Sequence, residues 1–413
     1  MQFSCSILQR SQPSPTRKAL ALNRFNRGVE WYQKGELDRA VADYTLALTF
    51  DPKLVDAWIN RGHIQWRKGD LGAALADFNQ AIEVNPLHAG DRNNRGRMRY
   101  LKGDVQGAIA DYERALEINP RYFAAFINRG VARQRKGEIA PALSDCQQAL
   151  KLNPHSSDGY NLRGALRENQ DDLTGALADY TQAFELDPHN PAPLVNRGGI
   201  WYRRGEFEKV INDSTQAIAL DSHCAEAYAN RGVALREKGN LEEALRDFER
   251  AIELNPNVAQ TWNNRAAVKL QKGDLSGAIN DDTRALGLNP RFAEAWCDRG
   301  SARLRTGDLA GAINDFNQAL ALKPDFAFAL FNRGTARRQS NDVLGAIEDY
   351  SRVITLNPRN ANAYALRGLA RLQLGQETEA QQDFAQCLSL DKDLKVSLEQ
   401  MIAKVKNQLA AKR

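Results

Sequence analysis

The tripeptide Asn-Arg-Gly recurs along this chain at intervals of 34 residues or multiples of 34. Its asparagine stands at Asn26, Asn60, Asn94, Asn128, Asn196, Asn230 and Asn332. A fixed period of this length indicates repeated supersecondary units, and none of these buries its apolar face without a neighbour. Repeats that start at 21, 55, 89, 123, 157, 191, 225, 259, 293, 327 and 361 fill residues 21–394 without an insertion. The sequence therefore predicts one array of eleven repeats in a chain of 413 residues.

Each repeat carries the pattern of a helical hairpin. With the first residue of a repeat as position 1, position 8 is Gly in ten repeats, position 20 is Ala in ten and position 24 is aromatic in eight. These spacings place small and bulky residues on one face of each of two helices, where they can interlock. Gly near position 15 ends the first helix, and an Asn-Pro or Asp-Pro pair at positions 31 and 32 ends the second. An all-α fold follows.

The pattern resembles that of the tetratricopeptide repeat family. One repeat matches it at Trp58, Gly62, Ala74, Phe78, Ala81 and Pro86. The Asn-Arg-Gly and Lys-Gly-Asp-Leu variants are similar to those of long prokaryotic members, especially cyanobacterial ones. The resemblance implies a right-handed superhelical solenoid whose first helices line a concave groove. It also implies a protein or peptide as the partner.

Three repeats depart from the pattern at position 24, where Cys146, Ser214 and Asp282 replace the aromatic residue. We expect these repeats to pack less well and to depend on their neighbours. Residues 1–20 are expected to be a short disordered leader, with an organelle transit peptide as the alternative. Residues 395–413 continue a helical apolar pattern, which predicts a helix that caps the last repeat.

The charged residues are sorted by helix. The net charge is +5, but the first helices carry a surplus of Lys and Arg and the remaining parts a surplus of Asp and Glu. Position 7 is Arg and position 23 is Asp in every repeat, from Arg27 and Asp43 to Arg367 and Asp383. We expect these residues to form ion pairs within or between repeats. The surplus that remains, which includes Arg97, Arg99, Arg133, Arg135, Arg203 and Lys269, favours an acidic partner only modestly.

Position 6 provides a row of candidate binding residues. It is Asn26, Asn60, Asn94, Asn128, Asn196, Asn230, Asn264 and Asn332, interrupted by Leu162, Asp298 and Leu366. A carboxamide both donates and accepts hydrogen bonds, so such a row can hold an extended peptide backbone. The row resembles the asparagine ladder in the repeat region of O-linked N-acetylglucosamine transferases. In the alternative interpretation, each Asn bonds to a neighbouring helix.

The resemblance places positions 2, 5, 9, 12 and 13 of each repeat on the groove, and the aromatic and basic residues of the first repeats are candidates for selectivity. Position 12 is aromatic in three successive repeats, as Tyr32, Trp66 and Tyr100, and His63 and Arg97 stand nearby. Aromatic anchors beside basic groups are typical of binding hot spots. Packing inside the array is the alternative role for these side chains.

The sequence predicts neither catalysis nor a bound cofactor or metal. It contains no H-E-x-x-H, G-x-S-x-G, G-x-x-x-x-G-K or Rossmann glycine motif. Its five cysteines are widely spaced, without a C-x-x-C pair, which favours a reducing compartment such as the cytoplasm. No apolar run is long enough to cross a membrane.

These features together predict a scaffold that binds a polypeptide segment in an Asn-lined, mildly basic groove. Binding of single-stranded RNA by the same surface is the first alternative. The period of 34 and the absence of a base-reading pattern make nucleic acid a less favoured partner. Self-association through the first repeat is the second alternative, and the sequence leaves the oligomeric state open.

Overall fold

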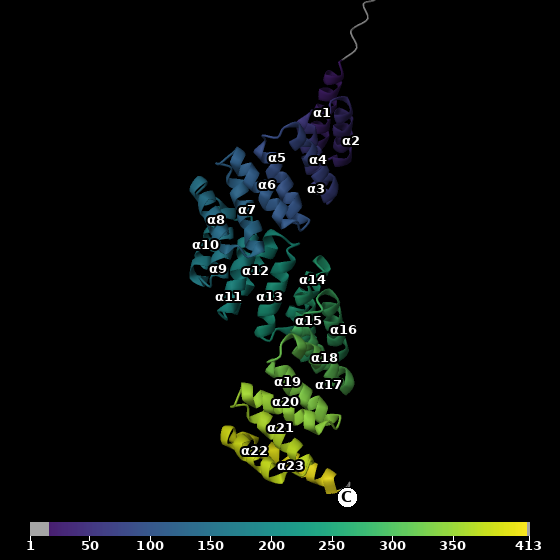
Figure 1. Ribbon diagram of the computed structural model, residues 1–413, viewed down its shortest axis with the longest axis vertical. Helices are drawn as coiled ribbons and strands as arrows, with labels where there is room; N and C mark the ends of the chain where they lie inside the picture. The colour runs from purple at the N-terminus through teal and green to yellow at the C-terminus, as the bar shows by residue number, and fades with distance from the viewer. Residues whose placement is uncertain (1–15, 411–413) are drawn as a thin grey trace, which may run out of the picture. The chain divides into compact units, whose positions relative to one another are not determined.

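The computed structural model describes residues 16–410, and within this range the ordered elements are helices, with no strand (Figure 1). The elements are α1 (Arg17–Gln33), α2 (Leu37–Phe50), α3 (Val55–Arg67), α4 (Leu71–Val84), α5 (Ala89–Leu101), α6 (Val105–Ile118), α7 (Phe123–Lys136), α8 (Ile139–Leu152), α9 (Ser157–Asn169), α10 (Leu173–Leu186), α11 (Ala192–Arg203), α12 (Phe207–Leu220), α13 (Ala225–Glu237), α14 (Leu241–Leu254), α15 (Ala259–Lys272), α16 (Leu275–Leu288), α17 (Ala293–Thr306), α18 (Leu309–Leu322), α19 (Ala327–Gln339), α20 (Val343–Leu356), α21 (Ala361–Gln373), α22 (Glu377–Leu390), the 3₁₀ turn η1 (Lys392–Leu394) and α23 (Lys395–Ala410). Every described helix is too short or too polar to span a lipid bilayer.

The helix ends follow from local residues. Gly137 ends α7 with a φ of 84°, a left-handed conformation that glycine adopts without steric cost. Asp171 and Asn341 take the same role where a repeat lacks this glycine, with φ values of 63° and 71°. Several even-numbered helices begin with an Asp cap, such as Asp104, whose carboxylate accepts the N–H of Gly107. The predicted helix boundaries are therefore confirmed in these repeats.

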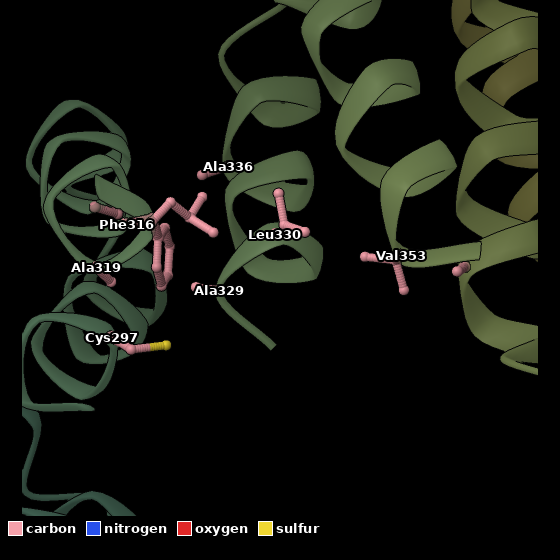
Figure 2. Packing of buried hydrophobic residues seen from close by; sticks show 10 residues of the cluster. Cys297, Phe316, Ala319, Ala329, Leu330, Ala336 and Val353 are labelled. Carbon is pink, nitrogen blue, oxygen red and sulfur yellow. The ribbon is translucent and has the colours of Figure 1, made fainter. Parts of the chain in front are cut away.

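The core consists of small residues and rings in alternation. The alanines at positions 20 and 27 and the rings at position 24 are almost fully buried, as in Ala312, Phe316 and Ala319. Figure 2 shows the Phe316 ring among Ala319, Ala329 and neighbouring apolar side chains. A Cβ atom added to Gly300 would lie 2.9 Å from the same ring, so glycine at position 8 is required for this approach.

The array divides into two compact units, with the boundary between Asn196 and Arg197. The single array predicted for residues 21–394 spans both. In each unit, an odd-numbered helix contacts its even-numbered partner and also the next odd-numbered helix, as α5 contacts α7 and α13 contacts α15. Consecutive odd-numbered helices therefore form a row within each unit.

The structure differs from the prediction at the N-terminal end of the array and agrees with it at the C-terminal end. Most of the expected leader lies outside the described residues, but α1 begins at Arg17 rather than after residue 20, because the Thr16 hydroxyl accepts the N–H of Ala19. The predicted C-terminal helix is present as α23, although residues 411–413 lie outside the described chain. Leu398 and Val405 of α23 are buried against α21. This helix covers apolar surface that the last repeat would otherwise expose.

Candidate functional site

The Arg at position 7 and the Asp at position 23 form a bidentate ion pair in every repeat. From Arg27–Asp43 to Arg367–Asp383, the guanidinium Nε and Nη2 each donate to one carboxylate oxygen, at N–O distances of 2.5–3.0 Å. The prediction of structural ion pairs is confirmed. The pairs join the two helices of a hairpin, since the partners are 16 residues apart.

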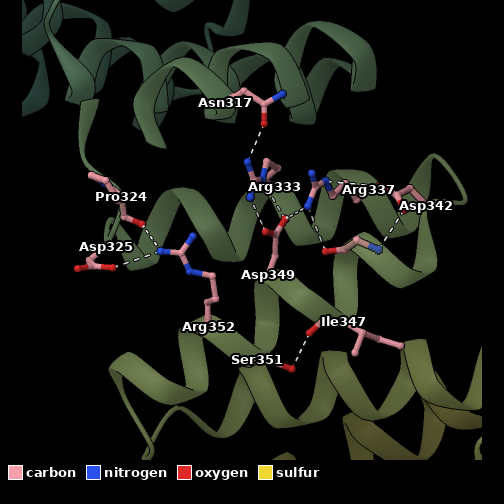
Figure 3. A network of polar contacts seen from close by, with 11 residues as sticks. Asn317, Pro324, Asp325, Arg333, Arg337, Asp342, Ile347, Asp349, Ser351 and Arg352 are labelled. Carbon is pink, nitrogen blue, oxygen red and sulfur yellow. Dashed lines mark hydrogen bonds and ion pairs between the residues drawn. The ribbon is translucent and has the colours of Figure 1, made fainter. Parts of the chain in front are cut away.

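A second cation often completes this network. Arg337 adds a bond of 3.0 Å to the Asp349 carboxylate that Arg333 already holds (Figure 3). Arg99, Arg133 and Lys269 make the equivalent contact in their own repeats. These bases are therefore held in place by buried aspartates, but two cations share one carboxylate, so that carboxylate does not cancel both charges.

Three of the predicted asparagines connect consecutive odd-numbered helices in the N-terminal unit. Asn128 Nδ2 donates to Asn93 Oδ1 at 2.8 Å, and Asn196 Nδ2 donates to Asn161 Oδ1 at 3.0 Å. Asn94 Nδ2 lies 3.3 Å from His63 Nε2. Their amide NH₂ groups thus act between helices, which favours the structural interpretation for these three residues.

The other asparagines of the row differ from one another. Asn26 is exposed, and Asn60 Nδ2 lies 3.5 Å from the Tyr44 hydroxyl. Asn264 accepts a bond from Gln260 on its own helix, and Asn230 lines a hollow described below. The buried Nδ2 of Asn332 has no hydrogen-bond partner among the described residues. The row is therefore not a uniform ladder of free amides.

The aromatic residues of the first repeats alternate with arginines. The Arg97 guanidinium lies 4.4 Å from the Trp66 ring centroid, and Arg135 lies 5.1 Å from that of Tyr100. Arg67 lies over Tyr32, whose side chain is 40% exposed, and also donates to its hydroxyl. These residues form a partly exposed stripe across consecutive odd-numbered helices. Each ring already has a cation on one face, which limits its use as a stacking platform.

The His63 side chain is more buried than the sequence suggests. Its ring packs against Phe78 at 5.3 Å and is half-buried. Burial, assisted by the positive charge of Arg97, lowers the pKa of His63. A neutral imidazole accepts a bond from the Asn94 amide, in agreement with the 3.3 Å contact.

Two of the three departures at position 24 are compensated by neighbours. Leu162 of the following repeat fills the space beside Cys146, where a Cβ on Gly130 would lie 2.9 Å from its side chain. Asp282 instead accepts a bond of 2.9 Å from Asn263, which also donates to Asp298. Burial raises the pKa of Asp282 to about 8. The expected dependence on a neighbouring repeat is confirmed at Cys146, whereas the partner of Asp282 lies in its own repeat.

The third departure lies near a hollow. Ser214 is fully buried, and a Cβ on Gly198 would lie 3.7 Å from the Asn230 amide and 4.0 Å from the Ser214 Oγ. No side-chain or other atom would lie within 4 Å of a Cβ on Gly199. A cavity of about 450 Å³ is lined by both glycines, whereas Ser214 is not among its lining residues. Its lining comes from α11 to α15 and includes Gly198, Gly199, Tyr202, Val210, Glu226, Ala229, Asn230, Val233, Arg236, Ala251, Gln260, Thr261 and Asn264.

Models of tetratricopeptide repeats match most of the chain. The matched ranges are residues 28–69, 59–123, 127–191, 225–258, 293–326, 334–375 and 361–394. The chain belongs to the tetratricopeptide repeat family. A comparison of this repeat protein with curated protein sequences gives no match.

Solved structures resemble parts of this tetratricopeptide repeat protein. MamA is 26% identical, with a TM-score of 0.38, over 39% of this chain and 95% of that chain. YrrB, described as a TPR protein with an unusual peptide-binding site, is 24% identical, with a TM-score of 0.39, over 45% and 95% of the two chains. PilF of Pseudomonas aeruginosa is 19% identical, with a TM-score of 0.45, over 49% and 92%.

Sequence reasoning named Asn230 and Asn264 individually as binding residues of this repeat protein. The resemblance also placed positions 9 and 12 on the groove, which are Val233, Tyr202 and Arg236 here, but it did not indicate that these residues line a hollow. The signal was present, because Ser214 lacks a ring and Gly198–Gly199 lacks side chains in the same repeat. The departure at Ser214 indicated loose packing, and the structure shows that the nearest atom to a Cβ on Gly198 is the Asn230 amide of the next repeat, at 3.7 Å.

Proposed function

We propose that this protein is a non-catalytic scaffold that binds an extended polypeptide segment along its odd-numbered helices. The observation that carries this proposal is the hollow, since its lining comes from α11, α13 and α15 in succession. Tetratricopeptide repeats form scaffolds typical of protein–protein interaction. A ligand that crosses three helices must be elongated, and a polypeptide segment has this shape.

The chemistry of the lining supports a polypeptide ligand. Asn230 and Asn264 stand at the same position of consecutive repeats, and their carboxamides can pair with both the N–H and C=O groups of a backbone. Val210, Val233 and Ala251 give the hollow an apolar floor for a side chain. Polar groups at the rim and apolar groups below are typical of binding sites for small or extended ligands.

The test is selection of ligands from a phage-displayed library of random peptides. A selected peptide is synthesised, and its Kd is measured by fluorescence anisotropy. We expect the double variant Asn230→Ala/Asn264→Ala to weaken binding about tenfold, because each lost hydrogen bond contributes about 0.5–1.5 kcal/mol.

The matched control is Asn280→Ala/Asn314→Ala, which removes two exposed asparagines from the even-numbered helices α16 and α18. It should leave the Kd unchanged. Equal weakening by both double variants would overturn the proposal. So would a library that gives no binder while single-stranded RNA binds with steep salt dependence.

A further inference from the structure

The N-terminal unit carries three arginines that are held by rings instead of carboxylates. Arg67, Arg97 and Arg135 lie on α3, α5 and α7, in three consecutive repeats. We propose that they form a docking surface for an acidic polypeptide segment, whose Asp and Glu carboxylates bind the three guanidinium groups. The hollow lies in the C-terminal unit, so this proposal goes beyond the proposed function and does not rest on it.

The first argument is the way in which the rings hold the arginines. Each guanidinium lies over a ring of the preceding repeat, as Arg67 lies 5.7 Å from the Tyr32 ring centroid and Arg97 lies 4.4 Å from that of Trp66. Attraction to a ring positions a cation but leaves its formal charge in place. A guanidinium that stacks on a ring keeps N–H donors at its edge, where a carboxylate can accept them. Groups that are positioned before the ligand arrives lower the entropic cost of binding.

The second argument is the absence of intramolecular partners. Among residues 16–410, no carboxylate forms an ion pair with Arg67, Arg97 or Arg135, and the side chains of Arg67 and Arg135 are exposed. Arg305 of the C-terminal unit stands at the same repeat position as Arg67 and Arg135, but it donates to the Leu270 carbonyl at 2.9 Å. The fold therefore uses the arginine of this position in the C-terminal unit and leaves its charge available in the N-terminal unit.

The surroundings favour separate carboxylates over a nucleic acid. The residues that follow two of these arginines in the chain, Lys68 and Lys136, are paired with Asp38 and Glu138. The available positive charge is therefore discrete and does not form a continuous surface. A nucleic acid also binds by stacking its bases on rings, whereas each of these rings has a guanidinium on one face. A polypeptide needs one acidic side chain for each arginine, and an extended segment is long enough to reach three repeats.

The test uses a fluorescein-labelled peptide of about twelve residues in which glutamate and glycine alternate, a length that crosses several helices when extended. Its Kd for the full-length protein is measured by fluorescence anisotropy at low ionic strength, where exposed charges are least screened. We expect the variant Arg67→Gln/Arg97→Gln/Arg135→Gln to weaken binding about tenfold, because three ion pairs, each modest at an exposed site, are lost together. A peptide with glutamine in place of glutamate should not bind.

Two further variants separate the docking surface from net charge and from misfolding. The matched control Lys151→Gln/Arg246→Gln/Arg284→Gln removes three exposed cations from the even-numbered helices α8, α14 and α16. It changes the net charge by the same amount and should alter the Kd by less than about twofold. Replacement of the three docking arginines by lysine preserves their charge, and this variant should bind the peptide more tightly than the glutamine variant. Circular dichroism checks that every variant is folded.

The proposal is wrong if the peptide does not bind, if the control variant loses as much affinity as the glutamine variant, or if the lysine variant binds no better than the glutamine variant. It is also wrong if Asn230→Ala/Asn264→Ala weakens the peptide, which would place the peptide in the hollow. A single-stranded RNA that binds more tightly than the peptide and loses affinity in the glutamine variant would assign the surface to nucleic acid instead. If the peptide binds as expected while the random library gives no binder for the hollow, the docking surface stands and the proposed function fails.

Discussion

Replacement of Ser214 by tyrosine should stabilise the protein, because it restores the ring that the other repeats use. Burial of an aromatic side chain removes about 150–250 Å² from water, which is worth at most about 4–6 kcal/mol at 25 cal/mol per Å². Ordering of the ring costs about 1 kcal/mol, and the hollow remains partly open. The variant also removes a buried hydroxyl without a partner. We expect a net gain of about 2 kcal/mol in the free energy of unfolding.

The assay is urea unfolding followed by circular dichroism, with amide hydrogen exchange in α11–α13 as the local measurement. The local measurement is needed because repeat arrays can unfold in parts. Ser144→Tyr is the matched control, since Ser144 is exposed on α8 and its replacement should change stability by less than about 0.5 kcal/mol. If Ser214→Tyr lowers the urea midpoint or accelerates exchange in α11–α13, the space beside Ser214 is not available and the reasoning is wrong.

Three further predictions concern the polar network, an acidic side chain and the C-terminal helix. Arg299→Met should lower the free energy of unfolding by about 1.5–3 kcal/mol in urea titration, because the fully buried Asp315 loses its bidentate partner and keeps only Arg303. A change below about 0.5 kcal/mol would contradict this. The pKa of Asp282, raised to about 8, means that its charged form is disfavoured in the folded state, so its contribution to stability declines from about pH 4 to pH 8. Asp282→Asn should therefore stabilise the protein by more than about 1.4 kcal/mol at pH 9 and by much less at pH 4. Urea unfolding at both pH values measures this, and an equal effect at both would contradict the raised pKa of Asp282. Val405→Asp should detach α23 from α21 and cause association that light scattering detects as a concentration-dependent mass, whereas an unchanged mass would show that α23 does not shield this surface.

The fold and the ion pairs could be predicted because each repeats the same residues at the same spacing. The hairpin follows from small residues and rings at fixed positions, and the Arg–Asp pairs follow from their presence in every repeat. The sequence assigned residues 17–20 to the leader, whereas α1 begins at Arg17. Thr16 provides a helix cap there, and it lies outside the repeat pattern.

The candidate site was less predictable, because it depends on contacts between unlike residues. The sequence shows that Asn128 and Asn196 share a position with Asn230, but not that Asn93 and Asn161 are available to accept their bonds. Leu162 interrupts the asparagine row, and only the structure shows that it fills the space beside Cys146. The hollow lined by Gly198, Gly199 and Asn230 depends in the same way on the space that neighbouring side chains leave unfilled.

The central claim is that the odd-numbered helices bind a polypeptide, and site-specific photocrosslinking tests it most directly. A photoreactive amino acid replaces Gln260, which is exposed at the rim of the hollow, or Asn280, which is exposed on α16. Both proteins are irradiated in an extract of the source cells. We predict an adduct at position 260 that protease removes and ribonuclease does not, with no adduct at position 280. Equal adducts at both positions, or an adduct that only ribonuclease removes, would contradict the claim.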